Sequence, residues 1–286
     1  MNNRSPWFWL FLTPVILGLG IVVVIPFIYG FIFSFTDWNG LTATQFTGLK
    51  NYIQLFHEDE FMHSIWFTVK FAFVTVILLN ILGLLLALLV TRNIKSNHML
   101  RTVFFMPNLI GGLILGFIWQ FVFVNVFNNI GDILGIEALQ GWLSTTTTGF
   151  WGLVILTVWQ MAGYIMIIYI AYLENIPKEL IEAAKIDGAS SFQRFKTVTF
   201  PLVAPAFTVS MFLTLSMAFK IYDQNLSLTN GGPYNSTQMV AMEIVRTAFS
   251  DNQMAYAQAK AVIFFLMVAV IALTQVYYNK KREVDL

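Results

Sequence analysis

The sequence contains no cysteine, and only 11% of its 286 residues carry a charge. The absence of cysteine excludes disulfide bonds and thiolate-bound metals. In soluble domains roughly a quarter of the residues are charged, so the scarcity of charge excludes an ordinary soluble globular domain. Apolar residues are abundant instead: 57% of the chain is hydrophobic, 16% is aromatic, and the mean hydropathy is +0.71.

Six apolar segments are long enough to cross a bilayer, which takes about 20 mostly apolar residues in a helix. They cover about residues 7–34, 64–91, 102–124, 150–173, 202–222 and 257–278. The sequence therefore predicts an all-α polytopic membrane protein with a single transmembrane domain over residues 1–286. The first segment is too long for a signal peptide and lacks a small-residue cleavage site, so we expect a retained helix.

The positions of lysine and arginine predict the orientation. With both termini in the cytoplasm, eleven basic residues lie in cytoplasmic segments. The external segments then hold Lys50, Lys220 and Arg246. Because basic residues accumulate on the cytoplasmic side, we expect six spans with both ends in the cytoplasm. The polar loop 174–201 then also lies there.

Acidic residues and histidine are missing from the middle of all six predicted spans. Ion-coupled secondary transporters usually carry such groups within the bilayer, so this class is disfavoured. The sequence likewise shows no cluster of histidines and carboxylates for a metal site or a membrane enzyme. Lys70 and Lys260 lie near the external ends of their spans, where we favour snorkelling or structural pairing over a substrate role. The driving force is therefore expected to come from outside this chain.

The polar loop carries eight charged residues between Glu174 and Lys196. Pro177 suits the first turn of a helix over residues 178–187. Gly188 suits the left-handed residue that ends it, and Ser190 or Ser191 suits the cap of a second helix. Four residues give the first helix an apolar side: Leu180, Ile181, Ala184 and Ile186. The pattern predicts a helix–turn–helix, either a docking surface or an ordinary loop packed on its own bundle.

The loop resembles a known motif. Glu182-Ala183-Ala184, then three residues, Gly188, nine residues and Val198-Thr199-Phe200-Pro201 is similar to the EAA loop of binding-protein-dependent ABC transporter permeases. Val198 and Phe200 depart from the Ile and Leu that this family prefers. The segments IPKELIEAAKIDGAS and LTNGGPYNST resemble the sugar-uptake, maltose-type group. The resemblance implies the type I ABC importer permease fold, with residues 174–201 as the coupling loop.

The resemblance also implies function and partners. The chain is expected to be a permease subunit, not an enzyme, that imports an oligosaccharide by ATP-driven alternating access. A permease for glycerol-3-phosphate or a polyol is the alternative, in which Lys70 and Lys220 would matter more. The implied partners are a second homologous permease, a cytoplasmic ABC ATPase dimer that holds ATP and Mg, and an extracellular solute-binding protein. The implied surroundings are lipid, in a bacterial-type inner membrane, with no cofactor in this chain and no nucleic acid.

The family's functional residues can be carried over by position. The coupling residues would be Glu182, Ala183, Ala184, Gly188 and Pro201, with Gly188 needed for backbone shape and Glu182 for a polar contact or cap. The substrate-binding candidates are Asn108, Trp159, Gln160 and Tyr164 and, by a looser match, Lys220, Tyr222 and Asp223. Amides, carboxylates and aromatic faces suit sugars. For the aromatics, interfacial anchoring or helix packing remains open, and for Asn108 an interhelical hydrogen bond. The turn at residues 231–233 would face the outside, where a binding protein docks.

Overall fold

The computed structural model describes residues 6–41, 44–92 and 96–281. Within these ranges the regular elements are helical, and one isolated antiparallel bridge joins Thr36 to Phe46. The chain divides into two compact units, Met1–Met62 with Glu243–Leu266 and His63–Met242 with Met267–Leu286. The single domain over residues 1–286 stays a prediction.

In the part of the chain that the structure describes, six helical segments are long and apolar enough to cross a membrane, which confirms the predicted all-α membrane architecture. They are Phe8–Phe33, Asp59–Val90, Gly112–Leu134, Thr146–Leu173, Ser191–Phe219 and Met254–Lys280. The fifth begins earlier than the predicted residue 202, because the second helix of the polar loop runs into it without a break.

The third segment differs from the predicted span at 102–124. Residues Thr102–Phe105 belong to a separate helix, α5 (Asn97–Phe105), which is followed by a 3₁₀ turn at Met106–Leu109. Ile110 and Gly111 are extended, with ψ angles of 129° and 141°. A new helix, α6 (Gly112–Phe121), continues through a π-helical turn into α7 (Phe127–Leu134). Pro107 lacks the N–H that a continuous helix needs, so the chain breaks there and the span shifts toward the C-terminus.

In the first unit, one long helix leads into a short surface segment. Helix α1 (Pro6–Leu19) continues through a π-helical turn into α2 (Ile25–Phe33), and α3 (Lys50–Leu55) follows. Gly30 of α2 lies directly against the first part of α14 (Met254–Lys280): a β-carbon there would meet Gln258 Oε1 at 2.7 Å. The rings of Phe27 and Phe265 are 5.1 Å apart. Small residues allow such close approach between membrane helices.

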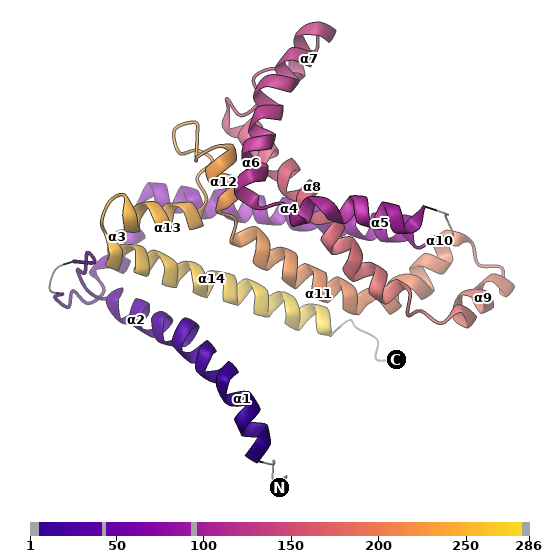
Figure 1. Ribbon diagram of the computed structural model, residues 1–286, viewed down its shortest axis with the longest axis horizontal. Helices are drawn as coiled ribbons and strands as arrows, with labels where there is room; N and C mark the ends of the chain where they lie inside the picture. The colour runs from indigo at the N-terminus through magenta and orange to yellow at the C-terminus, as the bar shows by residue number, and fades with distance from the viewer. Residues whose placement is uncertain (1–5, 42–43, 93–95, 282–286) are drawn as a thin grey trace. The chain divides into compact units, whose positions relative to one another are not determined.

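The second unit is organised around α8 (Thr146–Leu173), which packs against α5 and against α11 (Phe200–Phe219). Figure 1 shows α6 and α7 running across the direction of α5 and α11. Gly163 marks a close approach of α8 to α5, since a β-carbon there would lie 1.9 Å from the carbonyl oxygen of Phe104 on α5. The short helix α12 (Asp223–Leu228) packs on α6.

A buried hydrogen-bond network ties three of these helices together. Asn80, on α4 (Asp59–Val90), donates from Nδ2 to Thr214 Oγ1 at 3.1 Å and to the carbonyl of Val76 at 2.8 Å. The hydroxyls of Tyr169 and Ser210 lie 2.9 and 2.6 Å from Asn80 Oδ1. α4, α8 and α11 are thereby joined through neutral groups in an apolar setting, as is typical of membrane bundles.

Candidate functional site

The polar loop forms two short helices separated by a tight turn. Helix α9 (Lys178–Ile186) has Asp187 as its C-cap, and Gly188 follows with a φ of +79°. The Gly188 N–H donates to the carbonyl of Lys185 at 3.1 Å, and the Ala189 N–H donates to that of Ala184 at 3.0 Å. These two bonds make a Schellman motif, which needs a left-handed residue at this position. The predicted helix stop at Gly188 is confirmed.

The second helix begins with a capping box at Ser190. Its hydroxyl accepts from the Gln193 N–H at 3.3 Å, and Gln193 Oε1 accepts from the Ser190 N–H at 2.7 Å. Of the two serines proposed as the cap, Ser190 takes the role. The chain then passes without interruption through α10 (Ser191–Arg194), a π-helical turn (Phe195–Thr199) and the start of α11, where Pro201 lies in the first turn.

Apolar side chains of this loop are exposed. Ile186 is 87% exposed and Phe192 73%. Ile186 belongs to the apolar side predicted for α9, and the described part of the chain leaves it uncovered. Glu182 and Ala183 are exposed and Ala184 is half-buried. Figure 1 shows α9 projecting beyond the end of α11. Such a mixture of exposed apolar and charged groups suits a protein-docking surface.

A cavity of about 390 Å³ lies among α4, α8 and the end of α11. This volume is large enough for a small ligand. Its walls mix apolar groups with hydroxyl, amide and ammonium groups. The lining residues are Thr75, Leu79, Thr157, Met161, Leu213, Ser216, Met217, Ala218, Lys220, Ile221 and Gln224. Sugars have apolar ring faces and peripheral hydroxyls, so walls of this composition fit them.

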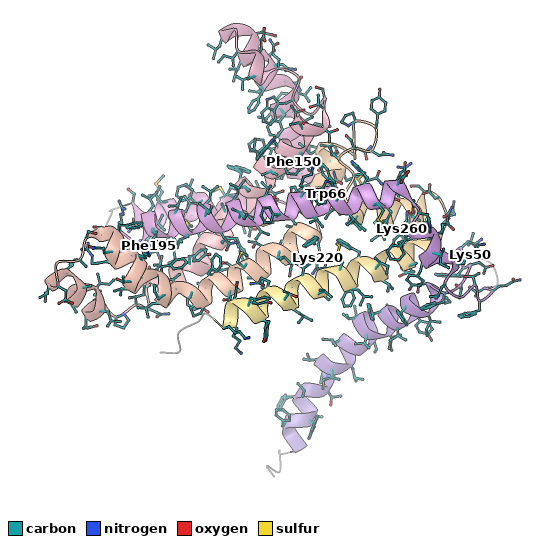
Figure 2. The ribbon with its side chains drawn as sticks, turned by 180° about the vertical axis from the view of Figure 1, so that it is seen from behind. Lys50, Trp66, Phe150, Phe195, Lys220 and Lys260 are labelled. Carbon is teal, nitrogen blue, oxygen red and sulfur yellow. The ribbon has the colours of Figure 1, made fainter. Side chains whose placement is uncertain are left out.

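Two of the predicted substrate residues belong to this cavity or its wall. Lys220 lines it at the end of α11, where Figure 2 labels it. Gln160 does not line the cavity but holds the lining residue Gln224 by a hydrogen bond. Its Oε1 accepts from Gln224 Nε2 at 2.9 Å, and its Nε2 donates to the carbonyl of Ile110 at 3.0 Å. This chain of bonds sets the Gln224 side chain against the break between α5 and α6.

The other predicted substrate residues lie elsewhere. Trp159 lines a separate apolar cavity of about 650 Å³ between α4, α5 and α8. Asn108 is half-buried on the 3₁₀ turn, and Tyr164 is half-buried on α8. Tyr222 caps α12, and the side chain of Asp223, its first residue, is exposed. The structure therefore does not gather the seven residues into one pocket.

Thr75 and Thr157 are cavity residues that the sequence reading missed. Both hydroxyls are buried, and the described part of the chain offers neither of them a hydrogen-bond partner. A buried hydroxyl without a partner costs roughly 1–3 kcal/mol, so it needs an explanation. The sequence feature that could have identified them is a threonine within an otherwise apolar span.

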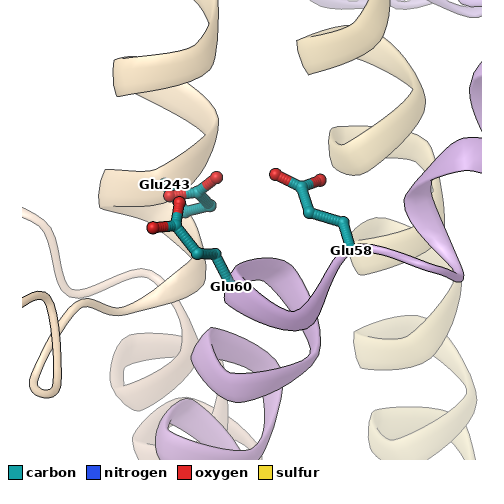
Figure 3. A group of neighbouring side chains, drawn as sticks. All are labelled: Glu58, Glu60 and Glu243. Atoms are coloured by element: carbon teal, nitrogen blue, oxygen red, sulfur yellow. The ribbon is translucent and has the colours of Figure 1, made fainter.

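Three carboxylates converge in the first unit, although the sequence showed no carboxylate cluster. Oxygens of Glu58, Glu60 and Glu243 lie within 4.8 Å of one another, and Figure 3 shows these groups pointing together. Glu243, on α13 (Val240–Phe249), is remote in sequence from Glu58 and Glu60, so no local pattern indicates this cluster. The expectation that the chain holds no metal site stays a prediction. The side chains could approach a cation, but an ammonium of the protein already lies among them.

That ammonium belongs to Lys260, which is only 1% exposed. Its Nζ donates to Glu243 Oε1 at 2.7 Å, to Glu58 Oε1 at 2.9 Å and to Thr247 Oγ1 at 3.0 Å. Tyr256 donates to the second oxygen of Glu58 at 2.5 Å. All three ammonium protons are used, so of the two structural roles considered for Lys260, pairing is the one observed.

The chain is similar to known membrane transport proteins. Residues 80–284 match the family described as binding-protein-dependent transport system inner membrane component. Over 280 residues the chain is 60% identical to the probable starch degradation products transport system permease protein AmyD of Thermoanaerobacterium thermosulfurigenes, covering 98% of this chain and 96% of that protein. It is 32% identical to the trehalose/maltose transport system permease protein MalF of Thermococcus litoralis, with 96% and 93% covered.

Solved structures show the same fold. A chain of a bacterial ABC transporter involved in the import of the acidic polysaccharide alginate matches with a TM-score of 0.84 at 20% identity, over 98% of this chain and 96% of that one. A chain of the bacterial alginate transporter in complex with a periplasmic protein that holds an alginate pentasaccharide matches with a TM-score of 0.81 at 21% identity, over 97% and 93%. The predicted permease fold is confirmed.

Proposed function

Because the chain belongs to the family of binding-protein-dependent transport system inner membrane components, we propose that it is the permease subunit of an ABC importer that takes up an oligosaccharide by ATP-driven alternating access. The observation that carries this proposal is the 60% identity, over nearly the whole chain, to a permease named for starch degradation products. The relative from Thermococcus litoralis is named for trehalose and maltose. α-Linked glucose oligomers are therefore the substrates to test first.

The substrate path runs past the cavity formed by α4, α8 and α11. The hydroxyls of Thr75 and Thr157, which have no partner among the described residues, and the amide of Gln224 supply hydrogen-bonding groups, while Leu79 and Met161 supply apolar surface. The predicted substrate roles of Asn108, Trp159 and Tyr164, and of Tyr222 and Asp223, stay proposals that need their own tests.

A glycerol-3-phosphate or polyol permease is the second candidate. One observation favours it: Lys220 lines the cavity, and an ammonium is a suitable partner for phosphate.

The coupling loop binds a cytoplasmic ATPase dimer, which holds ATP and Mg. The exposed side chains of Ile186 and Phe192 and the rigid turn at Gly188 support this role. A second permease subunit and an extracellular solute-binding protein complete the importer. The chain is a multi-pass membrane protein, and the basic residues support a bacterial-type inner membrane with both termini in the cytoplasm.

The test is reconstitution of the chain with its partner permease, ATPase and binding protein in proteoliposomes. Maltotriose should stimulate ATP hydrolysis and accumulate inside, whereas glycerol-3-phosphate should do neither. Stimulation by glycerol-3-phosphate alone would favour the second candidate. Hydrolysis that responds to neither compound, with or without binding protein, would contradict import of both substrate classes.

Gly188 allows a sharp test of coupling. Its φ of +79° strains any residue with a branched side chain, while a β-carbon there would meet no atom within 4 Å. Gly188→Val should therefore distort the turn and abolish stimulated ATP hydrolysis and uptake, although the protein still inserts. Gly188→Asn is the matched control, because asparagine tolerates left-handed backbone and should retain most of the activity. Full stimulation in the valine variant would overturn the coupling role.

A further inference from the structure

A polar pocket of about 210 Å³ lies in the first unit, apart from the two cavities described above. Three segments of the chain form it: residues 36–39 after α2, helix α3, and residues 252–256 at the start of α14. The lining residues that matter here are Asp37, Trp38, Asn39, Gln54, Gln253 and Tyr256. The pocket therefore lies at the ends of two spanning segments rather than in the middle of either.

Hydrogen bonds that need no ligand hold the walls together. The Ala255 N–H donates to the carbonyl of Trp38 at 2.8 Å, which joins the start of α14 to the segment after α2. Asn51 Nδ2 donates to the carbonyls of Ser34 and Thr36 at 2.9 and 2.8 Å, which holds α3 against the same segment. Because the walls are already fixed, a ligand that binds here orders little of the chain.

The walls combine amides with aromatic rings. Side-chain amides come from Asn39, Gln54 and Gln253, and both glutamines are exposed. The indole of Trp38 stacks on Phe33, with ring centroids 4.4 Å apart. Amides donate and accept hydrogen bonds with neighbouring hydroxyls, and aromatic rings pack on the apolar face of a sugar ring. The composition of the pocket therefore fits a saccharide.

The charge of the pocket narrows the class of ligand. Of the described residues that line it, Asp37 alone carries a charge. Asp37 Oδ1 accepts from the Gln45 N–H at 2.7 Å, which fixes the carboxylate. A phosphate needs cationic partners, so an anionic ligand does not suit these walls. Calcium takes about six to eight oxygen ligands, including several carboxylates, so a single carboxylate does not suit it either. The fitting ligand is neutral and rich in hydroxyl groups.

The size and the position of the pocket agree with this class. Sites for drug-sized ligands measure roughly 300–1,000 Å³. A pocket of about 210 Å³ is smaller and suits a single sugar ring. By the order of the six spans, the segment after the first span and the segment before the sixth lie opposite the coupling loop, which joins the fourth span to the fifth. An importer receives its substrate on that side of the membrane.

We propose that this pocket is a second saccharide site, which holds one neutral sugar ring of the oligosaccharide on the extracytoplasmic face of the permease. The proposal rests on the proposed import function and adds a site separate from the cavity of α4, α8 and α11. The ring packs on Trp38. Its hydroxyls bond to the carboxylate of Asp37 and to the amides of Gln54 and Gln253. The remaining rings of the oligosaccharide extend into solvent.

The test uses the absence of cysteine from the chain, because an introduced cysteine is then its single thiol. Three exposed glutamines provide matched positions: Gln54 and Gln253 line the pocket from different walls, and Gln45 does not line it. Each is changed to cysteine in a separate variant, and the importer is placed in nanodiscs without ATP or binding protein. Labelling of this chain by a thiol reagent is then followed as maltotriose is added.

Maltotriose should protect both pocket cysteines and leave Gln45→Cys unchanged. At about ten times the half-protecting concentration, the labelling rate should fall about tenfold, because only the empty pocket reacts. Adding Asp37→Asn to either pocket variant should raise the half-protecting concentration about tenfold, since a hydrogen bond to a charged group is lost. Asparagine keeps an oxygen that can accept from the Gln45 N–H. Two reporters are used because each cysteine removes one amide and leaves the other in place.

The outcomes separate this site from the import function. If maltotriose protects neither pocket cysteine while the wild-type importer takes up maltotriose, the second site is overturned and import stands. Protection in an importer that takes up no maltotriose would support the site and contradict import of this sugar. Equal protection by glycerol-3-phosphate would overturn the proposed class of ligand. Equal protection of Gln45→Cys would mean that the effect does not arise in this pocket, and would overturn the site.

Discussion

Two buried polar clusters of this chain differ in charge, and the difference predicts how each responds to mutation. The cluster around Asn80 is neutral, and its members share partners: Tyr169 and Ser210 contact each other at 2.9 Å as well as Asn80. The cluster around Lys260 is ionic, and the one ammonium is the shared partner of Glu58 and Glu243. Removing a neutral member leaves the rest partly paired. Removing the ammonium leaves two carboxylates facing each other.

The two clusters also differ in how much stability is lost when one member is removed. A buried ion cluster gains its Coulomb energy against a large desolvation cost, so its net contribution is modest while the loss of one partner is severe. Hydrogen bonds between membrane helices contribute little each, because the alternatives within the membrane also find partners. The ionic cluster joins α13 to the start of α14, whereas the neutral one joins three spanning helices.

The largest effect is expected from Lys260→Met. Methionine keeps much of the volume but removes the charge, and the 95%-buried side chain of Glu243 loses its ion pair with Lys260. The loss of this buried ion pair is expected to cost about 3–5 kcal/mol, seen as a marked drop in the melting temperature of the purified protein in detergent. The triple variant with Glu58→Gln and Glu243→Gln should recover much of the loss. A single variant that melts like wild type would show that the carboxylates are solvated, and the contrast between the clusters would fail.

A smaller effect is expected from Asn80→Leu. Leucine fits the same space, and the hydroxyls of Tyr169 and Ser210 can still bond each other. The expected loss is about 1 kcal/mol, measured in the same melting experiment. Combining it with Tyr169→Phe should show coupling, because both changes remove the same bond. A loss as large as that of Lys260→Met would mean that charge does not decide the difference.

The sequence predicted the coupling loop in detail because its signals are local. Gly188 and Ser190 act within one helical turn of their partners, so their roles follow from the residue types and spacing. The six spanning helices of the described chain could also be predicted from the sequence, because each is a long apolar run. The sequence also showed Pro107 within the third span, but it did not show that the spanning helix begins only after the break, at Gly112.

The remaining features depend on contacts between residues far apart in the chain. No local pattern links Asn80 to Ser210, or Lys260 to Glu58 across about 200 positions. The cavity is also non-local: it is built from α4, α8 and α11, so spacing along one helix could not separate Thr157 from Trp159. These two residues are close in sequence but lie on different cavities, because they face different sides of α8.

The smallest effect is expected at an ion pair that is exposed. Arg101 Nη2 lies 2.5 Å from Glu174 Oε1, where the coupling loop begins, and the Glu174 side chain is 53% exposed. Water and salt screen such a pair, and Glu174→Gln keeps an oxygen that can accept the same hydrogen bond. We therefore expect a change of less than about 1 kcal/mol in the melting experiment, and less still at high salt. If Glu174→Gln lowered the stability as much as Asn80→Leu, burial would not explain the order of the three effects. Glu174 would then have a specific role in holding the coupling loop.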